Sequence, residues 1–347
     1  MTERIAMVGA GYFAQFQLEG WRDAGAPMVA LCDRDLARAE ALAARFGVPH
    51  CSADAGRMFD AVRPTLVDVV LPPAAQAGVV RAALERGIPT ICQKPFGTDL
   101  AQAEEMTAFA EAQRTPLVVH ENFRFTPWFR ECRRLIDAGI FGRLHGITFR
   151  LRPGDGQGAR AYLDRQPYFQ TMAQLLVRET AVHFIDTFRC LMGEVVAVTA
   201  RLRRLNRVIA GEDAGLIIFE FSDDRIGLFD GNRLNDHVAG NTRRTMGEMW
   251  LEGERGVLRL DGDARLWWKP HHGAEAQHAY ERSDVGAFGG ACTVLQAHVL
   301  AHLREGAPLH NGARDYLANL HVQAAVYHSH ASGRRVLMAQ FDPHSPS

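Results

Sequence analysis

The sequence predicts a two-domain α/β protein: an N-terminal parallel sheet with crossover helices, then an α+β domain built on a largely antiparallel sheet. Over about the first 120 residues, short apolar runs rich in β-branched residues alternate with longer Ala-rich helical patterns. From residue 122 onward, strand patterns follow one another with only short turns between them. At 347 residues the chain also exceeds the size at which one hydrophobic core usually stops growing.

The N-terminal pattern defines a first domain over residues 1–121, because each apolar run is followed by a helical pattern that can cross back over the sheet. Asp99 or Thr98 is placed to cap the last of these helices. The expected strands are 4–8, 28–32, 66–70, 90–92 and 117–120, and the expected helices between them are 35–46, 73–86 and 100–113.

A second domain is expected over residues 122–341, and residues 342–347 are expected to form a short polar tail. This domain should begin with a helix at 128–138, a strand at 144–151, a Gly-rich loop at 153–158 and one continuous helix across 171–191. The strands expected next are 195–204, 215–221, 225–230, 248–252, 257–261 and 265–268, and the last helices are 290–304 and 312–331.

Composition narrows the class of partner to small molecules. A formal net charge of −1 gives no long-range attraction for nucleic acid or for an anionic membrane surface. The six cysteines include no C-x-x-C pair, so reduced thiols and a cytoplasmic location are expected. We see no leader and no apolar run long enough to span a bilayer. His298 and His302 are four apart, but Val299 stands where a zinc H-E-x-x-H motif has glutamate, so no metal site is expected.

A nucleotide-binding pattern follows the first expected strand directly. Gly9 allows the tight turn, Gly11 lets the backbone approach a pyrophosphate, and the small Ala14 lets helix and strand pack closely. Tyr12 and Phe13 complete this G-x-G-x-x-A loop, whose helix N-terminus presents unpaired N–H groups to an anion. The strand–turn–helix context makes a dinucleotide site much more specific than the glycine pattern alone.

Asp33 stands at the end of the second expected strand, 24 residues after Gly9. An acidic side chain at that place can accept hydrogen bonds from the ribose hydroxyls of adenosine, which favours NAD as cofactor. Arg34 follows at once and could instead reach a 2′-phosphate, so NADP remains a possible cofactor.

Lysine is rare in this chain: among 39 Lys and Arg residues, only Lys94 and Lys269 are lysine. Arginine keeps its proton near neutral pH, whereas a buried lysine can exchange it, so a retained lysine is a candidate for proton chemistry. Lys94 follows an expected parallel strand and so lies at the carboxyl edge of the sheet, where ligands bind in open α/β folds. Lys269, in contrast, is expected to be an ordinary surface cation.

Glu179 and His183 are four residues apart in the expected helix 171–191 and therefore share one face. A carboxylate in that position can orient the imidazole and fix its tautomer, as in a general acid/base pair. The alternative is an ion pair on a solvated helix face. The apolar neighbours Val182, Phe184 and Ile185 make a fully exposed helix a poor explanation.

Taken together, these motifs resemble the Gfo/Idh/MocA oxidoreductases, the family of glucose–fructose oxidoreductase and inositol dehydrogenase. The residues that carry the resemblance are 9–14, Pro72 and Pro73, Lys94 and Pro95, 122–124, 139–142, and the spaced acid with His183 and Asp186. It implies a Rossmann domain, an open-faced C-terminal sheet used for contacts between identical subunits in a dimer or tetramer, and hydride transfer from a sugar or polyol hydroxyl. It also implies that Leu71, Pro72, Gln76 and Gln93 contribute to the cofactor site.

Three positions depart from the usual family pattern. Gln93 stands where the family usually has Glu, Gln76 where it usually has His, and Glu179 where it usually has Asp. The stretches 91–96, 120–127 and 166–169 look similar to a branch acting on aldoses that includes D-apiose dehydrogenases. These differences predict an altered substrate geometry.

The mechanism implied is oxidation of a hydroxyl, such as the anomeric one to give a lactone. His183 would accept the proton while Lys94 stabilises the alkoxide, or the two would exchange roles. Asn122, Arg124 and Tyr168 are candidates for holding substrate hydroxyls. Two other functions stay open: a non-catalytic nucleotide-sensing or scaffold protein of the same fold, and an NAD-dependent glycoside hydrolase.

Overall fold

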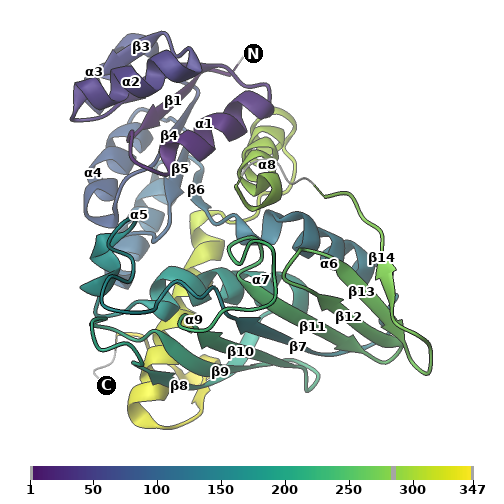
Figure 1. Cartoon of the computed structure of the whole chain (residues 1–347). Coiled ribbons are helices and arrows are strands. Elements are labelled where there is room, and N and C mark those ends of the chain that lie inside the picture. The colour runs from purple at the N-terminus through teal and green to yellow at the C-terminus, as the bar shows by residue number, and fades with distance from the viewer. Residues whose placement is uncertain (1–2, 283–286, 345–347) are drawn as a thin grey trace. The chain divides into compact units, whose positions relative to one another are not determined.

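The computed structural model of the chain describes residues 3–282 and 287–344, so residues 345–347 of the expected tail lie outside the described part. It divides into two units (Figure 1). One holds the described residues of 1–125 and 284–318, and the other holds those of 126–283 and 319–347. Each unit is built around its own β-sheet.

The first unit contains a six-stranded parallel sheet with the strand order β3-β2-β1-β4-β5-β6. This is the order of a Rossmann fold, so the predicted fold class of this part is confirmed. The strand order reverses between β1 and β4, which places the ligand crevice of such a sheet at their carboxyl ends. The strands are β1 (Ile5–Val8), β2 (Met28–Cys32), β3 (His50–Ser52), β4 (Leu66–Val69), β5 (Thr90–Gln93) and β6 (Leu117–His120).

Crossover helices join these strands, and aspartate caps three of them. Asp35, Asp54 and the predicted cap Asp99 each accept a hydrogen bond from a backbone N–H in the first turn of the helix that follows. Strand β3 and helix α3 were not predicted from the sequence, because three and eight residues are too few to show a clear period. The helices are α1 (Ala14–Asp23), α2 (Leu36–Phe46), α3 (Ala55–Val62), α4 (Pro73–Leu84) and α5 (Leu100–Ala112).

Helix α8 (Ala291–Glu305) belongs to this unit, although the sequence analysis placed everything after residue 121 in the second domain. It lies beside α1 in Figure 1. Leu295 and Val299 of α8 are buried in the same apolar core as Leu18 and Trp21 of α1. The domain boundary therefore has to be corrected, because a packing partner far along the chain completes the core of the first sheet.

The second unit contains a nine-stranded mixed sheet among the described residues, ordered β14-β13-β12-β11-β7-β10-β9-β8-β15. Only β7 and β10 pair in parallel, and the other neighbours are antiparallel, as the predicted fold class requires. The strands are β7 (Leu144–Leu151), β8 (Val195–Arg203), β9 (Ala214–Phe221), β10 (Ile226–Asn232), β11 (Gly247–Gly253), β12 (Gly256–Leu260), β13 (Leu266–Pro270), β14 (Ala276–His278) and β15 (Val336–Leu337).

Helices α6 (Pro127–Asp137) and α7 (Val182–Met192) pack in this second unit, and α9 (Ala313–Ser332) begins in the first unit and ends in the second. The ring of Phe184 of α7 packs at a tilt against Phe149 of β7 and Phe229 of β10, with ring centroids 4.0 and 5.2 Å apart. These contacts fix α7 against the centre of the sheet. In the described part of the chain, no helix has the length and apolar character needed to cross a membrane.

The predicted continuous helix over 171–191 is wrong in its first half. A short 3-10 turn, Pro167–Gln170, is followed by an irregular segment and then by a π-helical turn over Leu176–Ala181, after which α7 starts at Val182. The N–H of Leu176 donates a hydrogen bond to the carbonyl oxygen of Glu212, and the N–H of Val177 donates one to the Glu212 carboxylate. This buried acid from a distant loop supplies the partners that a preceding helical turn would otherwise supply.

Candidate active site

The loop between β1 and α1 has the geometry that the glycine pattern predicts. Gly9 has φ +111°, and a Cβ on it would lie 2.2 Å from the carbonyl oxygen of Val70, so only glycine fits there. A Cβ on Gly11 would meet no protein atom within 4 Å. Gly11 is therefore dispensable for packing, and its missing side chain leaves open space beside the first turn of α1. Ala14 is fully buried where the helix begins.

Tyr12 and Phe13 of this loop have different surroundings. Tyr12 is exposed, and its ring meets Phe16 edge-on at 5.5 Å. Phe13 stands at the N-cap of α1 and faces His120 at the end of β6, with ring centroids 6.3 Å apart. Phe13 thus packs against the end of β6, while the Tyr12 ring remains at the surface.

Asp33 is tied to the glycine loop. Its Oδ2 accepts a hydrogen bond of 2.8 Å from the N–H of Ala10, and its Oδ1 accepts one of 2.9 Å from the N–H of Asp35. A carboxylate can accept about four hydrogen bonds, so both oxygens keep acceptor capacity. Arg34 is exposed beside it. This hydrogen bond fixes the Asp33 carboxylate beside the glycine loop at the carboxyl edge of the sheet.

Gln76 braces the two loops that follow β4 and β5. Its amide nitrogen donates to the carbonyl oxygens of Leu71, Gln93 and Pro95 at 2.8–3.1 Å, and its oxygen accepts from the N–H of Gly97 at 2.9 Å. Gln76 is fully buried, which removes its side chain from direct contact with a cofactor. Its hydrogen bonds hold together the loops that contain Leu71, Pro72 and Lys94.

Lys94 begins the loop after β5 and precedes a cis peptide bond to Pro95. The side-chain oxygen of Gln93 accepts a hydrogen bond of 2.8 Å from the Lys94 N–H. With its amide nitrogen turned toward β4, Gln17 of α1 donates to Asp68 Oδ1 at 2.8 Å, and its oxygen accepts from Gln93 Nε2 at 2.8 Å. A buried polar chain thus runs from the middle of the sheet to the residue before Lys94.

Asp68 anchors this chain from the centre of β4 and was not identified in the sequence analysis. It is completely buried, and Trp21 Nε1 donates to its Oδ2 at 2.8 Å. Desolvation by burial raises the pKa of Asp68 to about 7, against the opposing effect of its hydrogen bonds with Trp21 and Gln296. An acid inside the otherwise apolar run Leu-Val-Asp-Val-Val was the signal that could have revealed it.

The end of β6 contributes a second buried titratable group. His120 pairs in register with Gln93, and neither of its ring nitrogens has a hydrogen-bond partner. Complete burial lowers the pKa of His120 to about 4, so the ring is neutral near pH 7. Asn122 donates to the thiol of Cys292 at 3.5 Å and is 3% exposed, so its side chain faces the interior rather than a substrate.

Arg124 is half-buried and acts electrostatically on His298, whose pKa is lowered to about 4. Burial is the largest cause of that shift, and the neighbouring His310, His302 and Arg124 add to it. Of the two candidates after β6, Arg124 thus remains the one with partial access to solvent.

The second unit holds the other predicted catalytic residues. Glu179 lies in the π-helical turn and His183 in the first turn of α7, and each is only 7% exposed. This burial rules out the alternative of an ion pair on a solvated helix face. Asp186, one turn beyond His183, is completely buried and accepts a hydrogen bond of 2.8 Å from Asn319.

Tyr168 interacts electrostatically with Glu179. The pKa of Tyr168 is raised first by burial and next by the negative charge of Glu179. The Tyr168 hydroxyl accepts a hydrogen bond of 3.1 Å from Gln166, and its ring packs edge-on against Phe169 at 5.0 Å. The side chain is 51% exposed, so the second unit presents a phenol at its surface beside a buried carboxylate.

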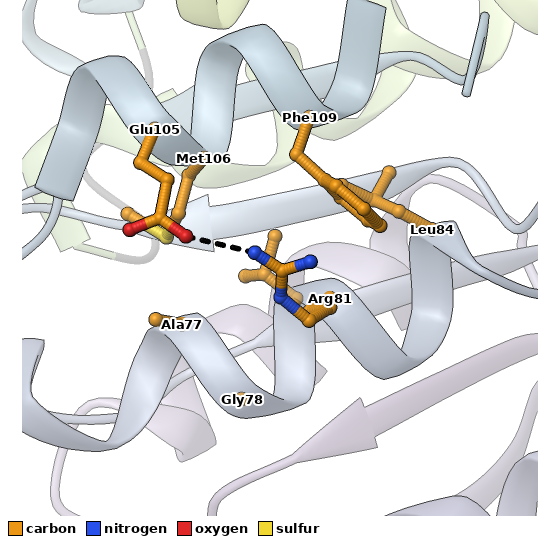
Figure 2. Close-up of a pocket in the computed structure, with 8 residues that line it drawn as sticks. Ala77, Gly78, Arg81, Leu84, Glu105, Met106 and Phe109 are labelled. Atoms are coloured by element: carbon orange, nitrogen blue, oxygen red, sulfur yellow. Dashed lines mark hydrogen bonds and ion pairs between the residues drawn. The ribbon is translucent and has the colours of Figure 1, made fainter. Parts of the chain in front are cut away.

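Two other features of the described chain do not add to this site. The hollow in Figure 2 lies between the later turns of α4 and α5, where Arg81 pairs with Glu105 at 2.8 Å and covers the Phe109 ring at 4.1 Å. Its lining contains none of the predicted site residues. Among the described residues, no group of three or more His, Cys, Asp or Glu side chains could hold a metal ion.

Comparison with known proteins agrees with this geometry. A sequence profile described as "Oxidoreductase family, NAD-binding Rossmann fold" matches residues 3–121, and the "GFO/IDH/MocA C-terminal domain" matches residues 129–259. A D-apiose dehydrogenase of Paraburkholderia graminis is 30% identical over 351 residues, which cover 99% of this chain and 91% of the relative. An inositol 2-dehydrogenase of Saccharopolyspora erythraea is 31% identical over 205 residues, 57% of this chain and 56% of the relative.

Solved structures have the same fold. An oxidoreductase from Agrobacterium radiobacter, solved in complex with NAD+, L-tartaric acid and magnesium, matches with a TM-score of 0.87 and 26% identity, covering 98% of this chain and 99% of that one. A levoglucosan dehydrogenase in complex with NADH and levoglucosan matches with a TM-score of 0.80 at 18% identity, over 98% and 100% of the two chains. The chain therefore belongs to the Gfo/Idh/MocA family of NAD-binding oxidoreductases.

Proposed function

We propose that this protein is a dehydrogenase that oxidises a hydroxyl group of a sugar or polyol, with NAD as its preferred cofactor. The observation that carries the proposal is the loop after β1, where Gly9 makes the turn and the space beside Gly11 is open. A pyrophosphate fits at that place because α1 starts there, and the positive end of the helix dipole favours an anion. Bound NAD supplies a hydride acceptor on its nicotinamide ring.

The preference for NAD over NADP rests on Asp33. Its carboxylate is held beside the glycine loop and keeps acceptor capacity for two ribose hydroxyls. A 2′-phosphate would bring a second negative charge against the same carboxylate, which disfavours NADP. Arg34 is exposed next to it and is the residue through which NADP could still be accepted.

A sugar or polyol is the substrate class that the relatives support. Proteins named D-apiose dehydrogenase match this chain over nearly its whole length, and inositol 2-dehydrogenases match over more than half of it. Arg124 and the exposed hydroxyl of Tyr168 are suited to hold substrate hydroxyl groups. Oxidation of an aldose at its anomeric carbon would give a lactone.

Proton removal is assigned to His183 and Lys94. His183, oriented by Glu179, takes the proton from the reacting hydroxyl, and the Lys94 ammonium stabilises the negative charge that develops on that oxygen. The reverse assignment, in which Lys94 takes the proton, uses the same residues. Burial of Glu179 and His183 supports a functional pair, because ionisable side chains are seldom buried without a partner or a task.

The deciding experiment measures reduction of NAD, by absorbance, with a panel of aldoses, polyols and glycosides that includes D-apiose and myo-inositol. One equivalent of NADH per equivalent of sugar consumed is the expected result. Hydrolysis of a glycoside without net NADH would instead identify an NAD-dependent glycoside hydrolase. Tight NAD binding with no turnover on any compound would identify a nucleotide-sensing protein.

Assembly and location belong to the same proposal. The face of the large sheet that carries Leu216, Ile218 and Ile226 leaves these side chains 39–46% exposed. Neighbouring apolar side chains on one face favour contact with a second copy, so we infer a homo-oligomer, which sedimentation can test. The absence of C-x-x-C pairs among the six cysteines supports a reducing, cytoplasmic compartment.

A further inference from the structure

A buried arginine lies directly after β10. Arg233 is 2% exposed, and its guanidinium donates to both carboxylate oxygens of Asp155, Nη2 to Oδ2 at 2.7 Å and Nε to Oδ1 at 3.2 Å. Nε also donates to the hydroxyl of Tyr162 at 2.8 Å, and Nη1 donates to the hydroxyl of Thr180. One planar group thereby reaches three separate partners from nitrogens held apart in a fixed fork, a geometry that a lysine ammonium lacks.

Two of these partners belong to the segment 153–170, which we call the β7 loop. Asp155 and Tyr162 are both in this loop, and the carbonyl oxygen of Arg233 also accepts a hydrogen bond from the N–H of Gly156 at 2.9 Å. The guanidinium lies over the rings of Tyr162 and Phe169, at 5.2 and 5.5 Å from their centroids. Phe169 in turn supports the ring of Tyr168. Arg233 therefore contacts Asp155, Gly156, Tyr162 and Phe169 and holds the β7 loop in its folded conformation.

The third partner, Thr180, lies in the segment that carries the predicted catalytic residue Glu179. Thr180 is the neighbour of Glu179 in the π-helical turn that leads into α7. Arg233 thus holds the loop that presents Tyr168 and the turn that presents Glu179 through a single side chain. The negative charge of Glu179 adds to burial in raising the pKa of Tyr168, so the two residues that Arg233 holds interact electrostatically.

We propose that Arg233 is a positioning residue that sets the spacing between Tyr168 and Glu179 and so determines which sugars are oxidised. The proposal rests on the proposed dehydrogenase function, because Tyr168 and Glu179 matter together only if both serve one substrate. Arg233 itself touches neither substrate nor cofactor in this scheme. Its guanidinium is buried and already engaged by Asp155, Tyr162 and Thr180, so it acts through them.

The sharpest variant is Thr180→Val, which removes the link to the π-helical turn and leaves the Asp155 pair in place. We expect KM for the best sugar to rise, or kcat to fall, by about ten- to a hundred-fold, since displacements near 1 Å have costs of this size. KM for NAD should change less than about twofold. Thr180→Ser, which keeps the hydroxyl, should restore the wild-type values. Thr107→Val removes an equally buried hydroxyl from α5 and serves as the matched control.

A second readout does not depend on activity. Arg160 lies in the β7 loop with a side chain that is 74% exposed, so trypsin can report how firmly the loop is held. Arg233→Lys keeps the charge but loses the planar fork, and it should be cleaved after Arg160 about tenfold faster than wild type. If this variant does not fold, the rate of cleavage after Arg160 is measured on Thr180→Val instead.

The two proposals can fail separately. If no sugar supports NAD reduction by the wild-type protein, the proposed function fails. Proteolysis still decides whether Arg233 holds the loop. If wild type is active and Thr180→Val leaves sugar kinetics and cleavage unchanged, the positioning role of Arg233 is overturned. Equal losses for sugar and NAD, or equal losses in Thr107→Val, would overturn it as well, because they would indicate general destabilisation.

Discussion

The carboxylate of Asp33 accepts a hydrogen bond of 2.8 Å from the backbone N–H of Ala10. This contact joins the end of β2 to the loop after β1. The acid proposed to bind the ribose is therefore held in place relative to the loop proposed to bind the pyrophosphate. A nucleotide placed there would meet groups whose positions are set before it arrives, which lowers the entropic cost of binding.

Asp33→Asn tests the cofactor preference. The amide oxygen can still accept from the Ala10 N–H, but the charge and half of the acceptor capacity for ribose hydroxyls are lost. We expect the Kd for NAD to rise by about tenfold, as each 1.4 kcal/mol of lost hydrogen bonding implies, while the Kd for NADP changes little or falls. Calorimetric titration with both nucleotides measures this. An equal loss of affinity for NAD and NADP would refute the assignment.

The two glycines of the first loop should respond differently to alanine. Gly9→Ala puts a Cβ 2.2 Å from the Val70 carbonyl oxygen at a positive φ, so this variant should lose several degrees in Tm or fail to fold. Gly11→Ala meets no protein atom and should keep the wild-type Tm. Its affinity for NAD should nevertheless fall by about tenfold or more, because the methyl group occupies the space left for the pyrophosphate. Unchanged NAD affinity in Gly11→Ala would move the nucleotide elsewhere.

Lys94→Met should abolish turnover while NAD affinity stays within a few-fold of wild type. The methionine side chain has a similar length but cannot carry a proton or a positive charge near the reacting oxygen. A loss of about a hundred- to ten-thousand-fold in kcat is expected for removal of such a group. The chain offers its own control, since Lys269 is exposed and is the other lysine. Near-normal turnover in Lys94→Met would place the chemistry on other residues.

Glu179 and His183 should behave as a unit. Glu179→Gln keeps the size of the side chain but removes the charge proposed to orient the imidazole, so the maximal rate should fall by about ten- to ten-thousand-fold. His183→Ala should cost at least as much. The double variant should cost little beyond the worse single change, because the second substitution removes a group that the first has already disabled. Steady-state kinetics of the four proteins decide this, and independent multiplicative losses would mean that the residues have separate tasks.

Asp68 predicts how stability depends on pH. Its pKa is raised to about 7 in the folded protein from an ordinary value of 3.8, so between these pH values the folded chain keeps a proton that the unfolded chain releases. The free energy of unfolding contributed by Asp68 therefore decreases as the pH rises from about 4 to 7. A tenfold change in proton affinity corresponds to about 1.4 kcal/mol, so the full effect is at most a few kcal/mol.

Asp68→Asn removes this titration and keeps an acceptor for Trp21. Urea unfolding of wild type and variant at pH 4, 5, 6 and 7 should show the variant gaining stability relative to wild type at each step. A difference that is constant across these pH values would show that the Asp68 carboxyl has an ordinary pKa in the folded protein.

The sequence alone determined where most strands lie and which residues at their ends are candidates for the cofactor site and the active site. Hydrophobic periodicity located most strands, and the Gly9 loop followed from a local pattern, since its glycines must satisfy backbone constraints that neighbouring residues impose. Asp33 and Lys94 followed from their places at strand ends, because the carboxyl edge of a parallel sheet is where such folds bind ligands. These are local consequences of residue type and spacing.

Only the tertiary structure decided which distant segments meet. Helix α8 joins the first unit because Leu295 and Val299 complete a core begun by α1. The π-helical turn before α7 depends on hydrogen bonds that the N–H groups of Leu176 and Val177 donate to Glu212. The place of the β7 loop depends on Arg233, which follows Asp155 by 78 residues. Local propensity cannot encode these contacts, because each exists only when two separate parts of the chain have already folded against each other.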